Sequence, residues 1–180
     1  MAEERLQKIL AQAGIAIIGL EPSCLLTLRD EALAMGLGLS AHTVAAKAVL
    51  LEEFIATEAQ AGRFGIAFKP SAKPVLVHGH CHQKAFDTVA AMMQVLALVP
   101  GTQARLIETS CCGMAGAFGY QVRHYATSMQ MAELSLLPAI RKDENAWVIA
   151  DGTSCRHQIQ DGAQREATHL AILLAAHLPG

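Results

Sequence analysis

Short apolar runs and longer helical patterns alternate along this chain. A continuous apolar run at residues 15–20 suits a strand covered on both faces, and further strands are predicted at residues 75–79, 104–108 and 147–150, each followed by a helix. Apolar residues at helical spacing predict helices over about 3–13, 24–33 and 40–61, two more that end near residues 98 and 177, and one that begins near 120. Alternating strands and helices indicate β-α-β units. We therefore expect an α/β fold, with a parallel sheet of about four strands and helices on both of its faces.

The chain is expected to form a single domain over residues 1–180. Residues 62–74 contain two glycines and two prolines and read as a connection, so the domain can be divided into lobes at 1–70 and 71–180. Residues 15–32 also align faintly with residues 146–163, which places Ser23-Cys24 over Ser154-Cys155. This alignment predicts an internal pseudo-duplication.

Composition and charge exclude several classes of function. With 52% hydrophobic residues in 180, the chain can bury a core without disulfides. The 14 basic and 16 acidic residues form no basic stripe, which argues against nucleic-acid binding. No apolar run approaches the roughly 18–20 residues of a membrane span, and the N-terminus lacks the pattern of a secretory signal. We expect a cytoplasmic protein, in which reduced cysteines serve metal or redox chemistry.

The cysteines follow the predicted strands one after another. Cys24 follows the first strand, Cys81 the second, Cys111 and Cys112 the third, and Cys155 the fourth. In an open parallel sheet, the loops that leave the carboxyl ends of the strands emerge at one edge, where α/β proteins build their sites. The sequence therefore predicts that these thiols converge on one metal site.

The segment from Ser110 to Gly119 carries the strongest chemical signal. Two adjacent cysteines are followed by Gly113 and two further glycines, and then by a helix. Glycine lets the backbone approach a bulky ligand closely, and a helix N-terminus offers N–H donors to a thiolate or an anionic cluster.

Histidines accompany the cysteines. His80 and His82 flank Cys81, and His157 lies two residues after Cys155. Their imidazoles could bind a metal directly, but we favour roles as hydrogen-bond donors to sulfur or as caps of the next helix, since five thiolates already suffice for a cluster.

Three functions remain open from the residues alone. The cysteines could hold an iron–sulfur cluster for electron transfer, or a zinc ion in a structural or interaction module. A thiol-dependent enzyme, such as a disulfide reductase, is the third option.

At the segments 19–24, 78–85, 110–120 and 151–159, the chain resembles the cysteine-rich "CCG" domain of iron–sulfur oxidoreductases. This domain occurs in the B subunit of heterodisulfide reductase and in the iron–sulfur subunit of glycolate oxidase. The motif sequences are most similar to the C-terminal part of long fusion proteins. Those proteins join an FAD-linked oxidase domain to an iron–sulfur segment, and the oxidase is of the type that acts on D-lactate and related 2-hydroxy acids.

The resemblance implies that the five cysteines bind a [4Fe-4S] cluster, with a noncubane form as one option. It also implies an FAD-linked oxidase domain or subunit as electron donor, and a quinone or another iron–sulfur protein as acceptor. The chain itself has no flavin motif and no complete catalytic apparatus, so it is expected to be a fragment or remnant of a longer oxidoreductase, peripheral at the inner membrane through a partner. Where the wider family often ends in Cys-x-x-Cys, this chain has Cys155-Arg-His157. Either His157 or Cys24 is then expected to complete the ligand set, or the cluster differs.

Overall fold

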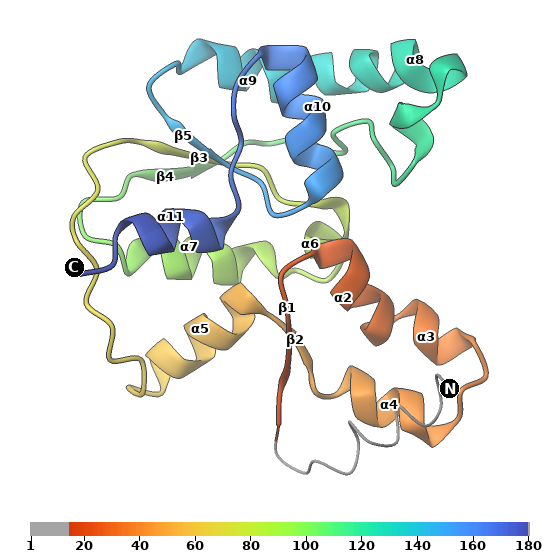
Figure 1. Ribbon diagram of the computed structural model, residues 1–180, viewed down its shortest axis with the longest axis vertical. Helices are drawn as coiled ribbons and strands as arrows, with labels where there is room; N and C mark the ends of the chain where they lie inside the picture. Colours follow the sequence, from red (N-terminus) through yellow and green to blue (C-terminus); the bar gives the residue numbers. More distant parts are fainter. Residues whose placement is uncertain (1–14, 180) are drawn as a thin grey trace.

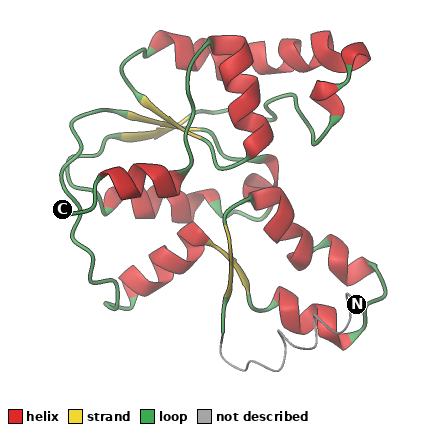
Figure 2. Ribbon diagram, viewed as in Figure 1, coloured by secondary structure: helices red, strands yellow, loops and turns green. Residues whose placement is uncertain are grey.

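The computed structural model describes residues 15–179 as two small parallel sheets with helices packed around them (Figures 1 and 2). The helix predicted over residues 3–13 lies outside the described residues. The mixture of helices and parallel strands confirms the α/β class.

The larger sheet has three strands in the order β4-β3-β5. The central strand β3 (Val75–Val77) pairs in parallel with β4 (Ala104–Leu106) on one side and with β5 (Trp147–Ile149) on the other. The segments that follow the strands are helical, as predicted, but each predicted helix is divided. Strand β3 is followed by α6 (Cys81–Ala85) and α7 (Val89–Ala97), and β4 by η1 (Phe118–Tyr120), α8 (Val122–Glu133) and α9 (Leu136–Lys142). Strand β5 is followed by α10 (Thr153–Ala163) and α11 (Leu170–Ala176).

Helices cover both faces of this sheet (Figure 1). Leu76 and Val148 point to one face, where they pack with residues of α8, α9 and α10. Val75, Val77 and Ile149 point to the opposite face, toward α7 and α11. Because the central strand is buried on both sides, its residues form a continuous apolar run rather than an alternating one. This is why the sequence pattern located it.

The smaller sheet corrects the prediction of one sheet with about four strands. Strand β1 (Ile17–Gly19) does not join β3, β4 and β5, but pairs in parallel with β2 (Ala48–Leu50). Helices α2 (Pro22–Arg29), α3 (Glu31–Ala34) and α4 (Leu39–Ala45) connect the two strands, and α5 (Leu51–Gln60) follows the second.

The single helix predicted over residues 40–61 is therefore wrong, because β2 interrupts it. Residues 40–61 are rich in good helix formers, but propensity is a weak prior that tertiary contacts override. Here the backbone of residues 48–50 pairs with β1. The carboxylate of Glu53 then accepts a hydrogen bond of 2.8 Å from the Leu50 N–H, which satisfies a free donor at the start of α5.

No helix within residues 15–179 is both long and apolar enough to cross a membrane.

Candidate metal centre

The loop after β4 is built to turn tightly. Gly113 has a φ of +94°, and a Cβ atom at this position would lie 2.1 Å from the carbonyl oxygen of Ser128. Only glycine fits such a position. The buried amide of Gln158 then fixes the loop, because its Nε2 donates to the carbonyl oxygens of Cys112 (2.9 Å) and Ser128 (3.0 Å).

This turn directs backbone N–H groups at sulfur. The Gly113 N–H donates to Cys111 Sγ at 3.2 Å, and the Ala115 N–H also stabilises the Cys111 thiolate. The Met114 N–H acts in the same way on Cys112. The loop is thus a cradle for anionic sulfur.

Four of the five predicted cysteines come together at the carboxyl edge of the larger sheet. Cys112 Sγ and Cys155 Sγ lie 3.4 Å apart, and only 2% and 1% of these two residues is exposed. Cys111 hydrogen bonds with the thiols of both Cys112 and Cys81, and it is half-buried, as is Cys81. The structure therefore contains a chain of four thiols in the order Cys81, Cys111, Cys112, Cys155.

The thiols alternate in acidity along this chain. Hydrogen bonding by Cys112 and Cys81 holds the pKa of Cys111 far below its usual range. Hydrogen bonding by Cys112 also lowers the pKa of Cys155 to about 5. The pKa values of Cys112 and Cys81 are raised, chiefly by the hydrogen bonds they donate to Cys111. A metal that binds all four sulfurs as thiolates must therefore displace protons from the thiols whose pKa is raised.

One histidine that sequence reasoning passed over belongs to this cluster. His78 is fully buried, and one of its ring nitrogens and the sulfurs of Cys112 and Cys155 all lie within 4.8 Å of one another. Its Nδ1 pairs with Thr109 Oγ1 at 3.1 Å, whereas its Nε2 is buried without a hydrogen-bond partner. The signal was available, because His78 directly follows β3 and so lies at the same strand edge as the cysteines.

Lys84 was also missed. Its ammonium group donates to the carbonyl oxygens of Thr109 (2.7 Å) and Ser110 (2.8 Å), and so holds the segment that leads into Cys111. Burial lowers the pKa of Lys84, while the charges of Cys81 and the other thiols of the cluster oppose that shift. Lys84 therefore places a positive charge beside the anionic sulfurs.

Three further predicted residues are exposed or make other contacts. Cys24, on the first turn of α2, is exposed. His157 is exposed as well, and its Nδ1 pairs with the Tyr120 hydroxyl at 2.5 Å. His82 Nε2 lies 3.8 Å from Glu31 Oε1. None of these residues contributes to the group of His78, Cys112 and Cys155.

His80 acts as a cap, one of the roles expected for it. Its Nδ1 accepts a hydrogen bond of 3.2 Å from the His82 N–H at the start of α6. The His80 ring passes so close to Gly152 that a Cβ atom there would lie 2.4 Å from His80 Cδ2. Burial lowers the pKa of His80, which favours the neutral ring that capping requires.

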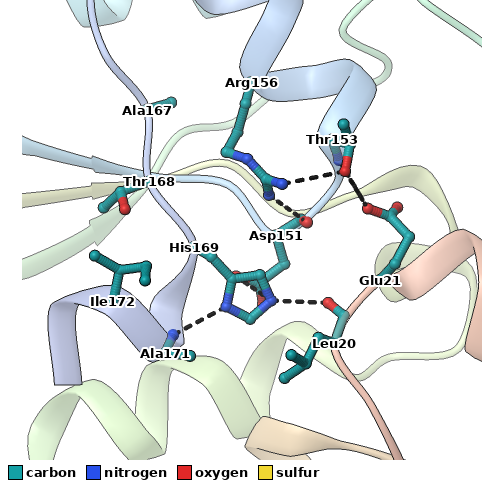
Figure 3. Close-up of a pocket in the computed structure, with 10 residues that line it drawn as sticks. All are labelled: Leu20, Glu21, Asp151, Thr153, Arg156, Ala167, Thr168, His169, Ala171 and Ile172. Carbon is teal, nitrogen blue, oxygen red and sulfur yellow. Dashed lines mark hydrogen bonds and ion pairs between the residues drawn. The ribbon is translucent and has the colours of Figure 1, made fainter. Parts of the chain in front are cut away.

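A polar junction joins the two sheets beside this cluster (Figure 3). Glu21 Oε2 accepts hydrogen bonds from the N–H (2.9 Å) and hydroxyl (2.8 Å) of Thr153, and His169 Nε2 pairs with the Leu20 carbonyl oxygen at 2.8 Å. Together with Arg156, these residues line a pocket of about 430 Å³. No cysteine lines this pocket, so it is distinct from the thiol cluster.

Two buried carboxyl groups lie deeper in the junction. Gln83 Nε2 donates to Glu52 Oε1 at 2.6 Å and lies 3.4 Å from Asp151 Oδ2. Burial, reinforced by the charge of Asp151, raises the pKa of Glu52 to about 7. Because Gln83 Oε1 also accepts from the His80 N–H at 2.8 Å, this pair is linked to the helix that carries Cys81.

The donor set fits a thiophilic metal or an iron–sulfur cluster. The sulfurs of Cys112 and Cys155 and a ring nitrogen of His78 form a buried group, and the half-buried thiols of Cys81 and Cys111 extend it. Backbone N–H groups and the Lys84 ammonium group lie beside these sulfurs. Thiolate and imidazole are the ligands that zinc and iron–sulfur clusters use in proteins.

No protein-family model and no solved structure matches the chain. It is 25% identical over 179 residues to the C subunit of the anaerobic glycerol-3-phosphate dehydrogenase of Escherichia coli (strain K12), a match that covers 97% of this chain and 43% of that protein. It is 29% identical over 166 residues to the D-2-hydroxyglutarate dehydrogenase of Pseudomonas putida, with 90% of this chain and 15% of that protein covered. The D-2-hydroxyglutarate dehydrogenase of E. coli is 26% identical over 153 residues, with 84% and 14% covered.

The chain thus spans less than half the length of these relatives. All three are named as dehydrogenases or as a subunit of one, so the similarity connects the chain with oxidoreductases.

Proposed function

We propose that this chain is the iron–sulfur electron-transfer part of an FAD-linked dehydrogenase that oxidises a 2-hydroxy acid or a related hydroxylated substrate. One observation carries the proposal: three neighbouring strand ends of one parallel sheet bring Cys81, Cys111, Cys112 and Cys155 into one continuous chain of hydrogen-bonded thiols. Packing alone gives no reason for four thiols to share one edge of a sheet. The similarity to a glycerol-3-phosphate dehydrogenase subunit and to 2-hydroxyglutarate dehydrogenases supports the choice of reaction class.

The four cysteines would hold a [4Fe-4S] cluster, which accepts and releases single electrons when bound. Cys24 as a further ligand of the same centre stays a prediction. The residues around the thiols would tune the centre: N–H groups of Gly113, Met114 and Ala115 stabilise negative charge on sulfur, and so does the Lys84 ammonium group. Such contacts make a reduced, more negative centre easier to form and raise its potential.

The partners in this proposal are a flavin-bearing domain or subunit that donates electrons, and a quinone or another iron–sulfur protein that accepts them. The half-buried Cys81 and Cys111 lie on the more accessible side of the cluster, and Cys112 and Cys155 lie on the buried side. We therefore place the route of electron entry or exit on the side of Cys81 and Cys111.

A mononuclear zinc centre is the second candidate. In a tetrahedral zinc site with bonds of about 2.0–2.3 Å, neighbouring ligand atoms lie between about 3.3 and 3.8 Å apart. The 3.4 Å separation of Cys112 Sγ and Cys155 Sγ falls in this range. A hydrogen bond between a thiol and a thiolate requires a similar separation, so the distance does not decide between zinc and iron.

Metal content decides between the two. The chain is purified anaerobically and incubated with iron and sulfide, and iron, acid-labile sulfide, zinc and visible absorption are measured. We expect about four iron atoms per chain and a broad visible absorption that bleaches on reduction with dithionite. About one zinc per chain, with no iron and no visible absorption, would reject the electron-transfer function in favour of the zinc centre.

A further inference from the structure

We propose that His78 ligates the metal centre through Nε2, and so adds a buried donor to those of the four thiols. This inference rests on the proposed function only in that it requires a metal at the four thiols. It concerns which residue completes the ligand set.

The backbone holds His78 at the centre. The His78 N–H donates to the Ile149 carbonyl oxygen at 2.8 Å, which extends the β3–β5 ladder by one residue past Val77. The position of the ring relative to Cys155, which follows β5, is therefore set by the sheet rather than by a mobile loop. The side chain is 0% exposed, so water does not compete for its nitrogens.

The ring has one nitrogen engaged and one free. Nδ1 pairs with Thr109 Oγ1, whereas Nε2 is buried, has no nitrogen or oxygen partner, and faces the sulfurs of Cys112 and Cys155. Hydrogen bonding by His78 helps to lower the pKa of Cys155, so this nitrogen lies within reach of whatever the Cys155 sulfur binds. Within residues 15–179, three other buried side-chain atoms also lack partners, those of His82, Thr102 and His124, but none of them belongs to a group of closely spaced metal-ligating residues.

Thr109 is placed to accept from the tautomer that ligation requires. The Lys84 ammonium group donates to Thr109 Oγ1 at 2.9 Å and occupies one of its lone pairs. The second lone pair can accept from Nδ1–H of His78 at 3.1 Å. A proton on Nδ1 leaves the lone pair of Nε2 free for a metal, in the pattern by which metal-binding histidines donate their other N–H to an oxygen.

The alternative is that Nε2–H donates a hydrogen bond to the sulfur of Cys155 or Cys112. In that case the imidazole tunes the centre but does not bind it. The two arrangements differ in whether nitrogen is bonded to the metal, and this difference can be measured without any assay of activity.

The test uses the full chain labelled with nitrogen-15 histidine and loaded anaerobically with iron and sulfide, or with Co²⁺ if iron is not taken up. Pulsed electron paramagnetic resonance of the reduced iron centre, or of the Co²⁺ centre, reports nitrogen bonded to the metal. We expect a strong coupling to one histidine nitrogen in the wild-type chain, its loss in His78→Gln, and its retention in His80→Gln. A wild-type centre with only the weak coupling of a hydrogen-bonded ring would overturn the proposal.

Affinity and rescue give a second readout. Loss of a residue that only hydrogen bonds a metal ligand lowers metal affinity about 10- to 100-fold. We expect His78→Gln to lower Co²⁺ affinity by more than this, and His80→Gln to lower it by an amount within this range. In His78→Cys, metal binding should return without the nitrogen coupling. Equal losses in the two Gln variants would contradict ligation by His78, and circular dichroism identifies a variant that has simply unfolded.

The two proposals fail in different ways. Absence of iron from the wild-type chain rejects the proposed function but leaves His78 testable with Co²⁺. Iron uptake without histidine nitrogen bonded to the metal rejects His78 as a ligand and leaves the electron-transfer function standing.

Discussion

Cys24 and Cys155 occupy the same position relative to a strand and a helix, but one side chain is exposed and the other is buried. Each follows a strand and a serine and lies on the first turn of a helix, α2 in one case and α10 in the other. Cys155 is 1% exposed and lies 3.4 Å from Cys112, whereas Cys24 is exposed. A cysteine after a strand is therefore not enough to place a thiol in the buried group of Cys112 and Cys155.

The difference lies in what the neighbouring strands carry. Strand β5 lies beside β3, which leads into His78 and Cys81, and β4 on the far side of β3 leads into Cys111 and Cys112. Strand β1 pairs only with β2, which runs directly into α5, where no cysteine or histidine follows. Sites form at the carboxyl edge of a parallel sheet only where several neighbouring strands of that sheet lead into functional side chains.

Serine substitution of these two cysteines tests the comparison most directly. We expect Cys155→Ser to lower metal affinity by more than about 100-fold, because it removes a buried donor whose loss exceeds that of an outer partner. Cys24→Ser should have a much smaller effect on metal content and visible absorption, because Cys24 is exposed and lies outside the buried group. Both variants are loaded anaerobically and analysed for metal content. Loss of the metal in Cys24→Ser would show that the centre recruits Cys24 and that the two positions are equivalent after all.

The second prediction compares a glycine from each region. In Gly113→Ala, the new Cβ meets the Ser128 carbonyl oxygen and the residue keeps a positive φ. Strain and overpacking together should lower the free energy of unfolding by about 3 kcal/mol or more. Gly36, between α3 and α4, has a φ of +70° but open space around it. Gly36→Ala should therefore cost only about 1 kcal/mol.

Urea unfolding of the reduced chain measures both glycine variants. Equal losses in the two would mean that the loop after β4 adapts as freely as the turn between α3 and α4. The tight fit between Gly113 and α8 would then not be what shapes the cradle.

Sequence reasoning located the strands of the larger sheet and most of its site. Residues 75–77 were found because a fully buried strand forms a continuous apolar run, and residues 104–106 and 147–149 because each precedes a helical pattern in the same alternation. The convergence of the four cysteines followed from parallel topology. Strand β2 was missed because its three residues sit within a stretch of good helix formers.

Which strands share a sheet could not be read from the sequence, because it depends on contacts between distant residues. For this reason Cys24 was assigned to the same edge as Cys155. His78 was overlooked for a different reason: three histidines surround Cys81, and only the fold shows which of them directly follows a strand and is buried at the cluster.

The smallest expected effect concerns the carboxyl group that joins the two regions. Glu52, on α5, lies beside Gln83 and Asp151 from the other region, and burial and the Asp151 charge raise its pKa to about 7, from 4.5. The native state therefore keeps a proton that the unfolded chain loses above about pH 4.5. The contribution of Glu52 to stability is full below pH 4.5, falls between about pH 4.5 and 7, and is level above that.

We expect Glu52→Gln, which cannot ionise, to remove this fall. Its free energy of unfolding should match that of the wild type near pH 4.5 and exceed it by up to about 3 kcal/mol at pH 8, at about 1.4 kcal/mol for each unit of the pKa shift. The depressed pKa of Cys155 acts in the opposite direction in both chains, so the difference between variant and wild type isolates Glu52. Glu58→Gln, on the solvent side of the same helix, is the matched control and should leave the pH dependence nearly unchanged. If Glu52→Gln is less stable than the wild type at pH 8, the pKa of Glu52 is not raised in the folded chain. The ionised carboxylate that accepts from Gln83 Nε2 then stabilises the junction.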